Sequence, residues 1–175
     1  MRSEQPPEEE VAPTRAGRLA ITALMLLPGA LIVFMGFNAG GYFPASVAVG
    51  ALVLAQILLV RVMQARRPFG GLAPVTLAAI AALGCYTLIT LVSALWSHST
   101  GRAIIEFDRA WLYLLILVLF GSIRASTQDL RWLLRGLVVG ASVVCLAGLI
   151  SRVLPDVWHT APDVANERLS YPVTY

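Results

Sequence analysis

Long segments without charged residues dominate the pattern of hydrophobic and polar positions along this chain. Residues 19–60 and 68–101 contain no Asp, Glu, Lys or Arg, and each segment is far longer than the roughly 18 apolar residues that indicate a membrane-spanning helix. A turn-forming Asn-Ala-Gly-Gly sequence divides the first segment. We therefore expect an antiparallel hairpin of helices at residues 19–37 and 43–60, followed by a third helix at residues 72–96.

Two further apolar segments follow. The uncharged segment 110–123 has 14 residues, which as a helix extend only about 21 Å, against a hydrocarbon core of about 30 Å. We therefore expect the fourth helix to begin earlier, at residues 103–123, with its charged residues at the membrane surface. A fifth helix is expected at residues 133–150.

These segments predict the fold class. Only helices and closed barrels satisfy every backbone hydrogen bond in lipid, and the segments lack the alternation of polar and apolar residues that a barrel requires. We predict an all-α fold, a polytopic helical integral membrane protein with about five transmembrane helices.

The two ends of the chain differ in composition from the apolar region. Residues 1–18 combine three prolines with the acidic run Glu8-Glu9-Glu10, which predicts a disordered tail. A cleaved secretory signal is disfavoured because the head is acidic and the apolar run after Arg18 is longer than a usual signal core. Residues 151–175 are polar, with three further prolines, and predict an exported loop.

The distribution of arginine predicts the orientation. All 13 basic residues are Arg, and positive charges in short loops favour the cytoplasmic side. We therefore expect a cytoplasmic N-terminus and an exported segment after Ile150. Nine arginines fall on one side of the expected helices, namely Arg2, Arg15, Arg18, Arg61, Arg66, Arg67, Arg124, Arg131 and Arg135, and four on the other, namely Arg102, Arg109, Arg152 and Arg168.

Composition supports lipid as the main partner. The chain is 58% hydrophobic and 13% charged, with a mean hydropathy of +0.76, too apolar for one soluble core. The net charge of +3 does not indicate nucleic acid, because the arginines lie between apolar segments and form no basic face. Cys85 and Cys145 lie within apolar segments without metal-ligand spacing, so we expect no metal site and no cofactor.

Two groups of polar residues are candidates for function. Arg102, Glu106, Asp108 and Arg109 could bind a charged headgroup or substrate at the membrane surface. The favoured alternative is an internal salt-bridge ladder, because the spacings are i,i+4 and i,i+3 and the four charges sum to zero. Thr87 and Thr90 could line a polar path, although hydroxyls that bond to their own helix are commoner.

Three short segments carry a resemblance to a known family. They are Ala-Leu-Trp-Ser at 94–97, Glu-Phe-Asp-Arg-Ala-Trp-Leu-Tyr at 106–113, and Glu-Arg-Leu-Ser-Tyr-Pro-Val-Thr-Tyr at 167–175. In this order they resemble the first half of bacterial O-antigen ligase and O-antigen polymerase proteins, over about residues 72–175. The resemblance implies roughly ten to twelve spans in the bacterial cytoplasmic (inner) membrane, and catalysis in a later exported loop. Because the family motif continues beyond the position of Tyr175, we expect this chain to be the N-terminal part of a longer protein and inactive alone.

The resemblance also implies an activity and one site residue. The family activity is transfer of a glycan from an undecaprenyl-pyrophosphate carrier to an acceptor at the outer face of the membrane, without nucleotide or metal. Arg168 matches the arginine of the family's third segment and is expected to bind the carrier pyrophosphate. The alternative for Arg168 is a loop ion pair with Asp163 or Glu167.

Two other functions remain open, so enzymatic activity is not assigned from the sequence. The first is a fragment of a membrane transporter or permease, whose mark would be charges or broken helices at mid-membrane. None of the charges here falls at the middle of an expected helix. The second is a non-catalytic membrane scaffold, favoured only by the lack of catalytic motifs.

The arginine distribution generates a topology prediction. A reporter that is active only outside the cytoplasm should be active when fused after Gly40, Gly101 or Tyr175, and silent when fused after Arg67 or Gln128, because arginine-rich loops stay inside. Enzymatic assay of the fusions in intact cells provides the measurement. An inverted pattern of activity would overturn the orientation.

Overall fold

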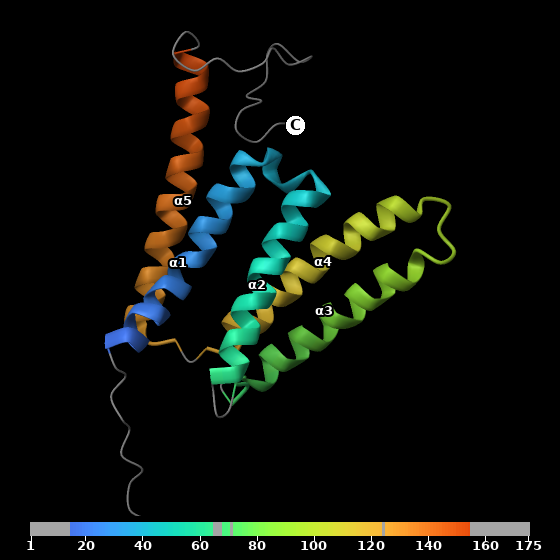
Figure 1. Cartoon of the computed structure of the whole chain (residues 1–175), viewed down its shortest axis with the longest axis horizontal. Helices are drawn as coiled ribbons and strands as arrows, with labels where there is room; N and C mark the ends of the chain where they lie inside the picture. Colours follow the sequence, from blue (N-terminus) through green and yellow to red (C-terminus); the bar gives the residue numbers. More distant parts are fainter. Residues whose placement is uncertain (1–14, 65–67, 71, 124, 155–175) are drawn as a thin grey trace, which may run out of the picture.

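Five long helices account for most of the described chain. The computed structural model describes residues 15–64, 68–70, 72–123 and 125–154, and these residues contain no strand. The all-α prediction is therefore confirmed. The elements are α1 (Arg15–Phe37), the short 3-10 helix η1 (Ala39–Gly41), α2 (Pro44–Gln64), α3 (Pro74–Ser93), α4 (Thr100–Gly121) and α5 (Thr127–Val153) (Figure 1).

Four of the five helices are long and apolar enough to cross a membrane. They are α1, α2, α3 and α5, and most of their apolar side chains are exposed, among them Leu88, Ile89 and Val138. In water such surfaces would be unstable, whereas lipid covers them without cost. The chain is a multi-pass helical membrane protein.

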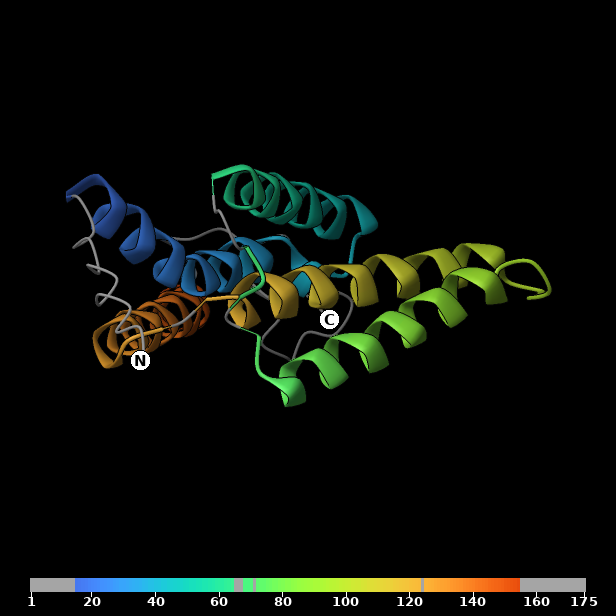
Figure 2. The same cartoon turned by 90° about the horizontal axis from the view of Figure 1, so that it is seen from below.

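The fourth helix, α4, is not among these four, because its first ten residues carry four charges, but its packing shows how it lies relative to the others. A Cβ at Gly50 of α2 would lie 3.1 Å from Leu112, while Arg61 at the end of α2 bonds to Ser122 after α4. The contact that lies later in α2 also lies later along α4, so α4 runs parallel to α2. It lies between α2 and α3 (Figure 2).

Helix α3 fixes the other side of α4. Thr76, in the first turn of α3, lies against Gly121 in the last turn of α4, so the two helices are antiparallel. The five helices therefore alternate in direction, which agrees with five crossings. We call the end where α1 and α5 begin and α2 ends the inner end, and the opposite end, with Tyr42 and the α3–α4 turn, the outer end.

The closest helix contact joins α1 to α5 through glycine. Gly29 of α1 lies directly against Gly136 of α5, and a Cβ at Gly140 would lie 2.5 Å from the carbonyl oxygen of Gly29. About two turns further along both helices, Gly36 lies against Val144. The contact that lies later in α1 also lies later in α5, so the two helices are parallel. Small residues allow such close approach of backbones, which is how helices associate strongly within lipid.

The first two helices have the antiparallel direction of the expected hairpin but pack little against each other. Helices α1 and α2 are antiparallel and joined by a tight turn in which Ala39, Gly40 and Gly41 have positive φ, but they diverge from this turn and touch little (Figure 1). Each finds another partner, α5 for α1 and α4 for α2. The short connection between the first two helices predicted that they are antiparallel, and the glycine surfaces determined which helix each one packs against.

The apolar core lies between α2 and α4. It consists of side chains spaced three or four residues apart on the facing sides of the two helices, as expected for helix packing. Partly buried side chains of α1, such as Leu31 and Met35, extend this core towards α5. The buried members are Val47, Ala51 and Leu54 of α2 and Leu112, Leu115 and Leu119 of α4.

Several helix boundaries differ from those expected. The first helix begins at Arg15, within the segment predicted as a tail, and residues 1–14 lie outside the described part. The third ends at Ser93, where the chain turns, three residues before Trp96. The fifth begins at Thr127, six residues before the expected start, because Ser126 and Asp129 form a capping box that stabilises the first turn.

The glycine contact generates a stability prediction. Gly140→Ala adds a single methyl group 2.5 Å from a backbone oxygen of α1, and overpacking of this kind costs about 1–3 kcal/mol. We expect a lower free energy of unfolding, measured by tryptophan fluorescence during denaturation in mixed micelles.

The matched control is Gly84→Ala in α3, where a Cβ would meet nothing within 4 Å. There alanine should be neutral or stabilising by up to about 1 kcal/mol, the difference in helix propensity. Equal effects of the two substitutions would contradict the packing role of Gly140.

Candidate functional site

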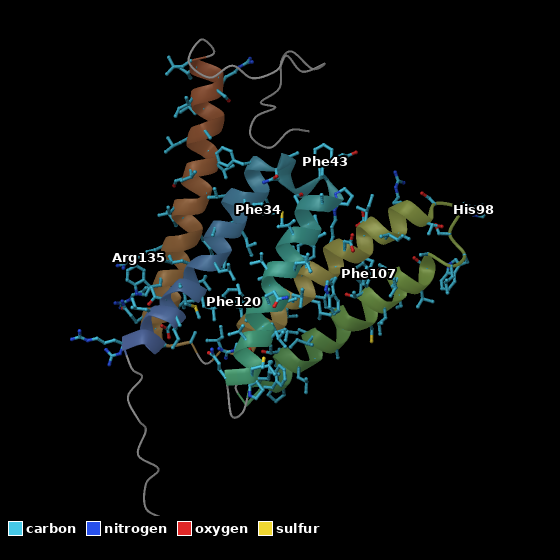
Figure 3. All side chains as sticks on the ribbon, in the orientation of Figure 1. Phe34, Phe43, His98, Phe107, Phe120 and Arg135 are labelled. Carbon is cyan, nitrogen blue, oxygen red and sulfur yellow. The ribbon has the colours of Figure 1, made fainter. Side chains whose placement is uncertain are left out.

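The tip of the α3–α4 hairpin, at the outer end, brings together two of the three segments that carry the family resemblance. Residues 94–97 form the turn after α3, and residues 106–113 lie on α4. The hydroxyl of Thr100 donates to the carbonyl of Ala94 at 3.5 Å, which connects the start of α4 to this turn. His98 lies at the tip of the hairpin and Phe107 along α4 (Figure 3).

The four charged residues of α4 form one ion pair instead of a ladder. Arg109 Nη1 lies 3.1 Å from Glu106 Oε1, and both side chains are substantially exposed. Neither Arg102 nor Asp108 makes an ion pair within the described part of the chain. The i,i+3 pair was predicted correctly and the i,i+4 pair of Arg102 with Glu106 is not formed.

The charge group therefore contributes little to stability. An exposed pair of this kind is worth about 0–1 kcal/mol. Arg102 is exposed and Asp108 half-buried, and each keeps its charge available at the outer end. This arrangement favours contact with water, headgroups or a charged substrate more than an internal structural role.

Exposed aromatic side chains lie at the same end of the molecule as these charges. Phe107 and Trp111 stack with ring centroids 6.2 Å apart, and Trp111, Tyr113 and Trp96 are exposed. Tyr42, also exposed, lies in the turn that follows α1. Exposed Trp and Tyr are typical of the membrane–water interface, where the ring meets lipid and its polar atom meets water.

The hydroxyls of α3 bond within their own helix. Thr87 donates to the carbonyl of Leu83 at 2.7 Å, Thr90 to that of Thr87 at 2.8 Å, and Ser93 to that of Thr90 at 2.7 Å. Thr87 is also buried, with a relative exposure of 2%. The interpretation of Thr87 and Thr90 as helix-bonded residues is confirmed, and they do not line a polar path.

Other candidates fall partly outside the described chain. Arg168 and its possible partners, Asp163 and Glu167, lie beyond residue 154, where the description ends. Cys85 and Cys145 are free and exposed on different helices. Among the described residues, no group of three or more His, Cys, Asp or Glu is placed to hold a metal ion.

One polar residue at the inner end gains a role that its sequence position did not indicate. From the sequence, Arg61 is only one of nine arginines expected on the cytoplasmic side. In the structure it lies within α2 and donates through Nη2 to the carbonyl of Ser122, at 2.9 Å. The partner is 61 residues away along the chain. No local sequence pattern could have predicted this bond, since it depends on the packing of α2 against α4.

No protein-family model, no curated protein and no solved structure matches this chain. The fold and the distribution of its polar groups define a multi-pass helical membrane protein with an aromatic and charged cluster at the outer end of the α3–α4 hairpin.

Proposed function

We propose that this chain is the N-terminal part of an O-antigen ligase-like protein of the bacterial cytoplasmic membrane. In this proposal the whole protein transfers a glycan from an undecaprenyl-pyrophosphate carrier to an acceptor at the outer face of the membrane. The observation that carries the proposal is the resemblance of the segments at 94–97, 106–113 and 167–175 to that family.

The hairpin tip supports the proposal by its chemistry. A pyrophosphate-linked carrier has a lipid tail, a doubly charged linkage at the interface and a glycan in water. Exposed Trp and Tyr suit the interface and stack on sugar rings, and both segments of α3–α4 supply such side chains. Arg102, exposed and without an ion pair in the described part, offers a cation at the same end.

The orientation supports the same conclusion. With nine arginines expected inside and four outside, the α3–α4 turn faces the exported side. The segment after α5 leaves from the outer end as well, because α5 runs parallel to α1. Residues 94–113 and 167–175 therefore belong to the same side of the membrane in this proposal.

Arg168 would bind the carrier pyrophosphate. A guanidinium stays protonated and offers a planar fork of donors to phosphate oxygens, which neutralises the pyrophosphate as it becomes a leaving group. Lysine has the charge without the fork. The alternative, an ion pair with Asp163 or Glu167, would make Arg168 structural.

A substitution at Arg168 tests the proposal. In the full-length protein that the resemblance implies, Arg168→Lys and Arg168→Ala should each lower glycan transfer at least about tenfold, roughly 1.4 kcal/mol of transition-state stabilisation, at normal membrane abundance. The assay is transfer to acceptor in membranes from a ligase-deficient strain.

Arg152→Ala is the matched control, since Arg152 is exposed in the last turn of α5, on the same side and outside the motif. Full transfer by Arg168→Ala, or equal loss in Arg152→Ala, would reject the role of Arg168 in carrier binding.

A further inference from the structure

An open cavity lies between α1 and α2 at the inner end. It has a volume of about 370 Å³, within the range of roughly 300–1,000 Å³ that is typical of small-ligand sites. The cavity exists because α1 and α2 diverge and pair with other helices. Its lining includes Ile21 and Leu24 of α1, and Ile57, Val60, Arg61 and Gln64 of α2.

The lining is divided into an apolar and a polar part. Leu24 and Ile57 lie deeper along the helices, whereas Arg61 and Gln64 lie in the last turns of α2, nearest the inner end. A ligand that fits this cavity has a hydrogen-bonding or charged head and an apolar body. Ions and sugars lack the apolar body.

Arg61 has donors left over for such a ligand. Its Nη2 donates to Ser122 O, whereas its Nε is buried and has no hydrogen-bond partner in the described part of the chain. A buried donor without an acceptor costs about 1–3 kcal/mol. The bond to Ser122 uses one of the five N–H donors of the guanidinium, and Arg61 lines the cavity, so the guanidinium can also donate to a ligand there.

No carboxylate of the described residues neutralises Arg61. Glu106 and Asp108 lie on the first half of α4, towards the outer end. Asp129, the third described acid, is at the inner end but accepts hydrogen bonds from the backbone and hydroxyl of Ser126. A guanidinium partly withdrawn from water requires a counter-ion, and within the described chain there is none.

The surroundings add to the positive potential. At the inner end the described helices carry five arginines and one carboxylate, Asp129. Anionic lipid surfaces attract such groups by about 1 kcal/mol for each cation near the surface. The arginines are Arg15, Arg18, Arg61, Arg131 and Arg135.

We propose that this cavity binds one anionic phospholipid of the inner leaflet. The phosphate accepts hydrogen bonds from Arg61 and Gln64, and the glycerol and first acyl carbons lie along Ile21, Leu24, Ile57 and Val60. The lipid joins α1 to α2, which touch little by themselves. This site is at the opposite end from the α3–α4 tip and does not depend on the proposed transferase function.

The test is lipid binding to the purified chain in detergent, measured by native mass spectrometry during titration with phosphatidylglycerol or phosphatidylcholine. We expect one tight phosphatidylglycerol per chain, with an affinity at least about tenfold above that of phosphatidylcholine. Arg61→Gln should lower phosphatidylglycerol affinity at least about tenfold, whereas Arg18→Gln, exposed at the same end and outside the cavity lining, should lower it no more than about fivefold, which corresponds to the roughly 1 kcal/mol of one surface cation.

A cavity-filling variant covers the case in which Arg61→Gln does not fold. Ala20→Phe places a ring in the cavity, which Ala20 lines, and leaves Arg61 intact, so it should also lower the affinity at least about tenfold. Equal binding of both lipids, equal loss in Arg18→Gln, or unchanged binding by Ala20→Phe would overturn the proposal. Displacement of the lipid by millimolar inorganic phosphate would instead identify a free-anion site and overturn it as well.

Discussion

The close approach of α1 and α5 holds the first and last described helices together, and the remaining arrangement follows from it. Within lipid no hydrophobic force drives helices together, so association depends on backbone proximity and dispersion contacts. Gly29, Gly136 and Gly140 provide that proximity. Because α1 packs against α5, α2 packs against α4 instead, and α3 packs against the other side of α4. The bundle is thus two groups of helices joined mainly by the turn after α1 and by side chains between them.

The junction between these groups is where the structure is least tightly filled. An apolar cavity of about 260 Å³ lies between α1, α4 and α5, lined by residues such as Leu31, Leu112 and Phe120. The second cavity, with Arg61, lies between α1 and α2. Both lie between the α1–α5 pair and the other helices, where the described backbones touch little. Lipid or further helices can fill such spaces.

The sequence predicted the number and type of the helices but not their partners. The two long charge-free segments indicated three helices and the two shorter apolar segments two more. The charges of α4 suggested interface pairs, of which Glu106–Arg109 is formed. Two available signals were missed. The spacing of Gly136 and Gly140 is that of the Gly-x-x-x-Gly motif, which indicates a helix contact surface, and Ser126-x-x-Asp129 indicates an earlier start of α5. The bond of Arg61 to Ser122 had no local signal, since long-range packing alone creates it.

The central claim is that α1 and α5 run parallel in close contact, which requires α4 to cross the membrane. In a chain with Cys85 and Cys145 replaced by alanine, Gly36→Cys with Val144→Cys should form a disulfide on mild oxidation. A Cβ at Gly36 lies 3.6 Å from that of Val144, within the usual disulfide range of about 3.5–4.5 Å. Gly36→Cys with Leu133→Cys should not cross-link. If α4 did not cross, α5 would run antiparallel to α1, and the second pair would cross-link in place of the first.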